Sequence, residues 1–422
     1  MMNTSTVSLY FKNDSFILWM VVMIGVLFSC DQKELMDKDH FLDHGYEISD
    51  MQETSQDLYQ ATSQDYKDEN FVISPLSIQL ALCMVYNGAD GDTKEEIGEL
   101  LRVMDGTTNW DLERLNKRTK SLLRYFNGLV RDGHLDIHNA LFYDDSRVAL
   151  AEDFVNRLET YFDVHKAELD FGSSKAVESI NEWVSNKTYD KIKEVIQDIS
   201  DQEVLFLINA LYLKADWVTG FQEQATSDRK FVTARGEEIT IPTMHRTGAV
   251  DHLNISGTQV VKLPLADSSL YTYLIMPQNP DELSDLIKSP MITEIWNQSL
   301  GFKNARVVLE MPVIETKTHL PLNQALQSLG MTSAFDPGKA DLGFMGESKV
   351  GPSLFVSRTL HDVYLKMDEK GVEGAAVTTI GVGTTSIPPA IQFNKPFLYL
   401  IVDHEKGLPL FIGQFTGVTK EN

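Results

Sequence analysis

The sequence predicts a mixed α+β fold with largely antiparallel sheets. Segments with helical patterning come early in the chain and segments with strand patterning come later. They do not show the regular alternation that marks a βαβ fold. From about residue 56 onward there is no linker, low-complexity stretch or internal repeat.

Three segments are expected to be helical. Asp57–Tyr66 is the first. Ser74-Pro75 begins the second, because proline fits the first turn of a helix and apolar residues follow at helical spacing. Asn181–Ile196 is the third. Four later segments, rich in β-branched, leucine and aromatic residues, are expected to be strands: Leu205–Leu213, Tyr271–Met276, Val307–Met311 and Phe397–Val402.

Composition limits the class of protein. Of the 422 residues, 61 are acidic and 37 are basic, so the formal net charge is −24, and 43% of the residues are hydrophobic. This apolar content supports a packed core and argues against disorder. The acidic balance argues against binding to nucleic acid and against attraction to anionic membrane surfaces, because both require clustered positive charge.

The two cysteines, Cys30 and Cys83, are too few for a disulfide framework or a zinc cluster. Cys83 lies within an apolar run, so inert packing is its expected role.

Residues 1–29 are predicted to be a signal peptide. The run Phe16–Phe28 is 13 residues without charge, which fits a secretory signal and is shorter than the ~20 residues of a membrane span. Leu27-Phe28-Ser29-Cys30 resembles a bacterial lipobox, although Phe28 is larger than the usual residue there. We therefore expect a lipid on Cys30 to hold the protein on the bacterial outer membrane or cell surface, with no other membrane contact. An ordinary signal peptide would instead leave it secreted or periplasmic.

Residues 30–55 are predicted to form an acidic tether. Eight acidic and two basic side chains lie between residues 31 and 55, with few large apolar ones, a composition typical of solvated chain. The folded domain is then expected to span residues 56–422.

No motif for catalysis, a cofactor or a metal ion is present, so the protein is not expected to be an enzyme. The sequence lacks G-x-S-x-G, H-E-x-x-H, a P-loop and C-x-x-C. Gly381-Val382-Gly383 begins like a dinucleotide fingerprint, but Ser386 stands where the third glycine is required. His40 and His44 have ligand spacing only inside the tether, where no metal site is expected. Motifs do not detect a triad assembled from distant residues, so that alternative stays open.

Residues 371–387 have the pattern of neither an ordinary loop nor a helix. They hold one charged residue, Glu373, whereas exposed loops are polar, and their glycines, threonines and valines disfavour a helix. Pro388-Pro389 prevent a strand from continuing further. The segment fits a central strand followed by a turn, or a loop able to become an inner strand. On strand alternation the face opposite Glu373 is uncharged: Val372, Gly374, Ala376, Thr378, Ile380, Val382 and Thr384.

Lys366–Ala376 resembles the hinge of the reactive-centre loop of serpins, the serine protease inhibitor family. Ser386–Phe397 resembles the sequence that follows the cleavage site in that family. Further motifs match in order along the chain, at residues 70–77, 139–142, 180–184, 209–221, 329–335 and 409–413. On these motifs the chain is identified as a serpin of the bacterial lipoprotein type.

The resemblance implies a single domain with three β-sheets, eight or nine helices and an exposed reactive-centre loop. In this family a target protease cleaves the loop, its serine forms an acyl-enzyme, and the first part of the loop inserts as a strand into the large sheet. The implied function is suicide-substrate inhibition of serine endopeptidases by a monomer, without cofactor or metal ion. The alternatives are a non-inhibitory serpin-fold binding protein and an inhibitor of papain-like cysteine proteases.

The resemblance also assigns site residues. It places the scissile bond at Thr385–Ser386. No Lys or Arg lies between Gly371 and Phe393, and Thr385 is small, which favours elastase-like over trypsin-like targets. The expected hinge comprises Glu369, Gly371, Val372, Glu373, Gly374, Ala375, Ala376 and Thr378. The expected shutter, a polar group under the sheet without a catalytic role, comprises Ser74, Ser77, Asn209, Ser357 and His361.

Overall fold

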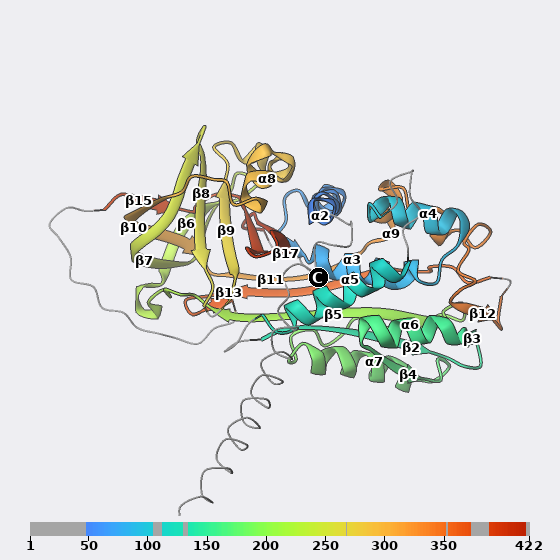
Figure 1. The fold of residues 1–422 in the computed structure, drawn as a ribbon. Coiled ribbons are helices and arrows are strands. Elements are labelled where there is room, and N and C mark those ends of the chain that lie inside the picture. The colour runs from blue at the N-terminus through green and yellow to red at the C-terminus, as the bar shows by residue number, and fades with distance from the viewer. Residues whose placement is uncertain are drawn as a thin grey trace, which may run out of the picture. The chain divides into compact units, whose positions relative to one another are not determined.

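The structure, a computed structural model, describes residues 48–103, 112–129, 134–266, 268–351, 353–372 and 388–418. They belong to the larger of two compact units of the chain, residues 46–422. In this described part, three β-sheets pack with eight α-helices (Figure 1). The prediction of a single α+β domain with three sheets is confirmed.

One sheet has six strands in the order β11-β13-β14-β5-β2-β4. All neighbouring strands are antiparallel except β2 and β4, which are parallel. Its strands are β11 (Ile314–Pro321), β13 (Leu360–Met367), β14 (Gly371–Val372), β5 (Leu205–Asp216), β2 (His134–Tyr143) and β4 (Val164–Glu168).

A second sheet has nine strands, eight of them in the order β1-β17-β16-β9-β8-β7-β10-β15, and β6 pairs with β7. Its strands are β1 (Phe71–Ile73), β17 (Leu408–Phe415), β16 (Phe397–Asp403), β9 (Leu270–Met276), β8 (Thr258–Pro264), β7 (Glu238–Ile255), β10 (Lys303–Pro312), β15 (Ala390–Gln392) and β6 (Ser227–Val232). The third sheet is a pair, β3 (Val148–Leu150) with β12 (Gly346–Ser348). The four predicted strands are confirmed as β5, β9, β10 and β16.

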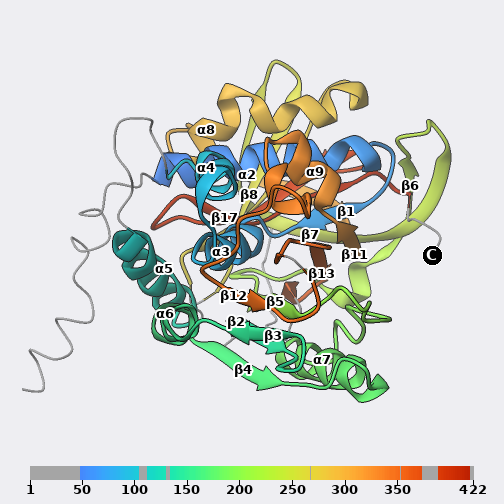
Figure 2. The same cartoon turned by 90° about the vertical axis from the view of Figure 1, so that its right-hand side faces the viewer.

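Helices cover both faces of the six-stranded sheet. Helix α3 lies between β5 and β17, and α7 packs on the opposite face of the sheet over β2 and β5 (Figures 1 and 2). The α-helices are α2 (Ile48–Ser63), α3 (Pro75–Tyr86), α4 (Gly91–Leu100), α5 (Leu112–Phe126), α6 (Glu152–Phe162), α7 (Ser174–Lys187), α8 (Pro290–Trp296) and α9 (Asn323–Ser328). The 3₁₀ helices are η2 (Gln64–Tyr66), η3 (Glu223–Ala225), η4 (Pro280–Lys288) and η5 (Ser333–Phe335).

The start of α3 is confirmed at the predicted position. Ser74 is the N-cap, and its hydroxyl oxygen accepts a hydrogen bond from the main-chain N–H of Ser77 at 3.3 Å. Among the helices of the described residues, none is both long and apolar enough to cross a bilayer.

Helix α7 ends earlier than the sequence predicts. The predicted helix Asn181–Ile196 stops at Lys187, because Tyr189 and Asp190 have positive φ angles of 51° and 63°. The amide of Asn181 then pins the following chain, accepting from the main-chain N–H of Val195 at 2.9 Å. The apolar residues between Lys187 and Ile196 are spaced as in a helix, but they are buried as part of an irregular segment.

Residues 48–55, which were predicted to be part of the acidic tether, form the first part of α2. Met51 is buried, and the buried Thr54 hydroxyl donates to the main-chain oxygen of Leu100 at 3.1 Å. Several buried side chains of this turn are polar, so they do not form the apolar stripe by which a helix is recognised in a sequence.

Met51→Ala should lower the free energy of unfolding by about 2–5 kcal/mol, because it leaves a cavity under α2. Urea denaturation of the purified protein measures the change. Glu53→Gln is the matched control, since 62% of the Glu53 side chain is exposed, and it should stay within about 0.5 kcal/mol of the wild type. Similar small changes in both variants would show that this turn does not contribute to the core.

Candidate functional site

The centre of the six-stranded sheet contains a strand of only two residues. Strand β14 pairs antiparallel with β5, where Gly371 lies opposite Asp216, and with β13, where Val372 lies opposite Met367. Among the described residues no ladder joins β13 directly to β5. Beyond Val372, the described part of the chain therefore places no strand between the facing edges of these two long strands.

Gly371 allows this close approach to β5. A Cβ atom at this position would lie 2.3 Å from the main-chain oxygen of Ala215 and 2.6 Å from the Cα of Asp216. No side chain fits such a contact without displacing the main chain. Val372, the next residue, is fully buried. The first residues of a strand between β5 and β13 are thus already paired, and residue 371 must be glycine.

The segment that leads into β14 is fixed by the chain that follows β5. The indole Nε1 of Trp217 donates to the main-chain oxygen of Asp368 at 2.8 Å. The main-chain N–H of Trp217 donates to the main-chain oxygen of Lys370 at 2.9 Å. The N–H of Phe221 donates to the carbonyl of Glu369 at 2.7 Å. The Glu369 carboxylate accepts from the Thr226 hydroxyl. These contacts hold the hinge at one end of the gap.

A polar network lies beneath the gap and connects its two sides. The main-chain N–H of Ser74 donates to Nε2 of His361 on β13 at 2.9 Å. The Ser77 hydroxyl donates to the side-chain oxygen of Asn209 on β5. Because Ser74 and Ser77 both lie at the start of α3, this helix end connects β13 with β5. Four of the five predicted shutter residues are therefore brought together.

Sequence reasoning missed one member of this network. Asn209 donates to the amide oxygen of Asn139 on β2 at 2.8 Å, and Asn139 donates to the main-chain oxygen of Phe162 at 2.7 Å. The pairing of Asn139 with Asn209 in the β2–β5 ladder places the two amides side by side. No strand was predicted around Asn139, so the sequence offered only the motif at residues 139–142 as a signal.

Ser357, the fifth predicted shutter residue, lies in a different cluster. Its hydroxyl is 3.4 Å from Oε1 of Glu203 and donates to it. Ser357 precedes β13, and Glu203 precedes β5, so this cluster lies at the start of both strands.

His361 is a neutral imidazole in the folded protein. Burial lowers its pKa from 6.5 to about 3, because the charged form loses its hydration. Its Nε2 accepts a hydrogen bond from Ser74, which a protonated ring does not do. The network therefore depends on the neutral form.

A cavity of about 180 Å³ lies between β5, α3 and the chain that leads into β13. Apolar side chains dominate its wall, including Phe206 and Ile208 of β5 and Leu354 and Leu360 near β13. Asn209 and His361 also line it. The space under the gap can thus receive additional small or apolar side chains.

Several predicted residues lie outside the described part of the chain. They are Cys30, Glu373, Gly374, Ala375, Ala376, Thr378, Thr385 and Ser386. Cys83 is described: it is buried, and burial raises the pKa of its thiol to about 12, which keeps it protonated.

In the described residues, the central position of the sheet is filled by only two residues, and the segment that leads into it is anchored at one end. This architecture defines the class of protein. The chain belongs to the serpin family: the family described as "Serpin (serine protease inhibitor)" matches residues 49–418.

Relatives with known names support this membership. Alpha-1-antiproteinase F of Cavia porcellus is 30% identical over 371 residues, which cover 86% of this chain and 89% of the relative. A serpin-like protein of Methanosarcina mazei is 29% identical, over 85% of this chain and 83% of the relative.

Solved structures show the same fold. The native state of tengpin, a thermophilic serpin, has a TM-score of 0.76 and 28% identity, covering 87% of this chain and 93% of tengpin. Thyroxine-binding globulin in complex with thyroxine has a TM-score of 0.78 and 25% identity, covering 88% of this chain and 99% of the globulin.

His361→Gln should remove part of the pH dependence of stability. In the wild type the neutral, buried histidine is protonated only on unfolding, so stability falls as the pH drops from about 6.5 toward about 3. Between about pH 6.5 and pH 5 this group alone contributes a loss of about 2 kcal/mol. Urea denaturation at about pH 7.5 and pH 5 measures the difference, which should be smaller in the variant by that amount.

Asn139→Ala is the control for this experiment. It removes a non-titrating member of the same network, so it should lower stability at both pH values and keep the wild-type pH dependence. An unchanged pH dependence in His361→Gln would contradict the assigned protonation state.

Proposed function

We propose that this protein is a suicide-substrate inhibitor of serine endopeptidases. The observation that carries the proposal is the pairing of Gly371 and Val372 with both β5 and β13 at the head of an unfilled strand position. A loop that starts in this position can continue the same ladder after it is cut. Membership of a family described as serine protease inhibitors supports the same conclusion.

The proposed reaction starts on the loop. The protease serine attacks the carbonyl carbon of Thr385, the bond to Ser386 breaks, and the chain from Ser386 onward leaves as the new amino terminus. The loop before Thr385 then carries the protease as an ester. Insertion between β5 and β13 pulls the protease away from the geometry that its deacylation step requires.

The composition of the hinge supports inhibition over simple cleavage. Gly374, Ala375 and Ala376 are small, and no charged side chain follows Glu373 as far as Ile387. The buried face of that strand must enter the apolar space beneath the gap, where a charge without a partner is costly.

The preferred target is an elastase-like protease. Thr385 is small and β-branched, and its neighbours Gly383 and Thr384 are small as well. A trypsin-like protease requires a cation before the scissile bond, and this loop offers none. A papain-like cysteine protease, which also forms an acyl-enzyme, is the second choice of target.

A non-inhibitory binding protein is the alternative of a different class. It is favoured by the similarity to thyroxine-binding globulin, whose structure holds thyroxine. Gly381 and Gly383 favour cleavage as an ordinary substrate without trapping, because flexible residues slow strand insertion relative to hydrolysis. Only the inhibitor forms a complex with a protease that survives a denaturing gel.

We also propose that a lipid on Cys30 anchors the protein to the bacterial outer membrane or cell surface. The apolar run that ends at Phe28 and the adjacent Leu27–Cys30 motif support this location.

Incubation with pancreatic elastase should give a covalent complex on a denaturing gel and a released fragment that begins at Ser386 by mass spectrometry. Thr378→Arg should abolish the complex while cleavage continues, because the arginine would be buried without a partner at a cost of several kcal/mol. Thr379→Arg is the matched control, since strand alternation places it on the opposite face, and it should still trap elastase. Trapping of trypsin without any effect on elastase would refute the assigned specificity.

Cys30→Ala should move the protein from the membrane fraction to the soluble fraction, or leave an uncleaved precursor. Fractionation of the producing cells followed by immunoblotting detects the change. Cys83→Ala, which removes the only other cysteine, should leave the fractionation unaltered. A Cys30→Ala protein that stays in the membrane in its wild-type amount would exclude the lipid anchor.

A further inference from the structure

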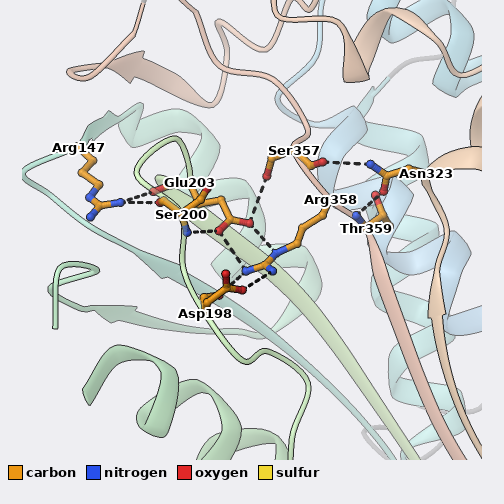
Figure 3. Close-up of polar contacts among 8 residues, drawn as sticks. All are labelled: Arg147, Asp198, Ser200, Glu203, Asn323, Ser357, Arg358 and Thr359. Atoms are coloured by element: carbon orange, nitrogen blue, oxygen red, sulfur yellow. Dashed lines mark hydrogen bonds and ion pairs between the residues drawn. The ribbon is translucent and has the colours of Figure 1, made fainter. Parts of the chain in front are cut away.

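Two charged residues form an ion pair between β5 and β13 at the end of the unfilled strand position that lies farthest from β14. Strand β14 is antiparallel to both β5 and β13, so these two strands are parallel and their amino ends lie at the same end of the sheet. Glu203 precedes β5, which starts at Leu205, and Arg358 precedes β13, which starts at Leu360. Figure 3 shows their side chains pointing toward each other.

The contact between Glu203 and Arg358 involves both carboxylate oxygens. The guanidinium Nε lies 2.6 Å from Oε1 as an ion pair without hydrogen-bond alignment. A terminal nitrogen of the same group donates to Oε2 at 3.1 Å. Asp198 supplies a second partner, with Oδ1 at 3.2 Å from Arg358.

Glu203 is a buried charge in this cluster. Its side chain is 4% exposed, whereas 28% of Arg358 and 80% of Asp198 remain exposed. The main-chain N–H of Ser200 also donates to Glu203, at 2.7 Å. A buried carboxylate with a cation and a main-chain donor is held firmly, because losing the cation leaves the charge uncompensated.

Both loops that carry this pair are fixed to the rest of the fold. Arg147 donates to the main-chain oxygens of Ser200 at 2.9 Å and Glu203 at 3.1 Å. On the other side, Asn323 donates to the main-chain oxygen of Ser357 at 3.0 Å and accepts from Thr359 at 2.7 Å (Figure 3). The ion pair therefore connects two anchored segments.

The strand register locates this pair on the path of insertion. Gly371 lies opposite Asp216, so thirteen residues further along the loop, at Thr384, the same register reaches Glu203. Val372 lies opposite Met367, so nine residues further, at Gly381, it reaches Arg358. The last inserted residues would thus arrive between Glu203 and Arg358.

We propose that the Glu203–Arg358 ion pair is a latch that closes the far end of the insertion path and limits the rate of full insertion. Main chains on either side of an inserted strand are about 9–10 Å apart. The register also places Glu203 opposite residue 384 and Arg358 opposite residue 381, about 10 Å apart along the strand, so the present contact must be released before the strand completes. Glu203 and Arg358 are positioning residues in this role. The inference rests on strand insertion as used in the proposed function, but it does not require that a protease be trapped.

The test uses strand insertion without a protease. An acetylated synthetic peptide with the sequence of residues 373–384, which continues from the two residues of β14, is added to the full-length protein, and its annealing is followed over time on native gels. Glu203→Gln keeps an acceptor for Ser200 but removes the charge, so annealing should be faster by on the order of tenfold. Glu159→Gln is the matched control, because it removes an exposed ion pair with Lys166 of β4 (3.1 Å), and it should anneal at the wild-type rate.

A second measurement separates a latch from general support of the fold. In urea, Glu203→Gln should lower the stability of the native protein and leave the peptide-annealed form unaffected, because the latch is already open there. Equal annealing rates in Glu203→Gln and wild type, or an equal loss of stability in both forms, would overturn the proposal. Faster annealing in a protein that traps no protease would uphold the latch and reject the inhibitor.

Discussion

The fold depends on one constraint: in the described residues, strands β5 and β13 do not form a ladder with each other. Buried main-chain N–H and C=O groups need partners, and a long strand normally finds them in a neighbour on each side. Strands β5 and β13 flank a position that β14 fills for only two residues. Contacts outside a strand ladder therefore set the distance between them: the Trp217 contacts at one end, the His361 network beneath, and the Glu203–Arg358 pair at the other end.

The two polar groups along this gap differ in kind. Among its side-chain contacts, the His361 network joins a neutral imidazole with hydroxyl and amide groups, so it is held by directional hydrogen bonds. The Glu203–Arg358 pair at the far end of the gap joins full charges, and its strength depends on the exclusion of water from Glu203. A strand that enters the gap disturbs the neutral network first and the charged pair last. Resistance to insertion is therefore expected to increase along the path.

Much of this arrangement could be predicted from local sequence. The N-cap at Ser74 and the strands β5 and β16 are each determined by neighbouring residues. The glycine at residue 371 was expected only from the resemblance to the serpin hinge, because the main chain that requires it lies on β5. The early start of α2 could not be predicted, because several of its buried contacts use polar side chains. The Glu203–Arg358 pair was also missed, since its members are 155 residues apart in the sequence and each alone resembles an ordinary surface charge. Contacts that close a gap between distant strands have no local pattern.

Burial of Glu203 also makes the Glu203–Arg358 ion pair insensitive to the ionic strength of the solution. Dissolved salt screens charges over about 8 Å of water at physiological concentration, and it acts much less on a pair from which water is excluded. Exposed pairs at the edge of the same sheet weaken as the salt concentration rises, such as Lys166 of β4 with Glu159 of α6, whose side chains are 39% and 44% exposed. The 4% exposure of Glu203 removes most of that influence. The strength of the Glu203–Arg358 pair is thus expected to be similar in brackish and in dilute media.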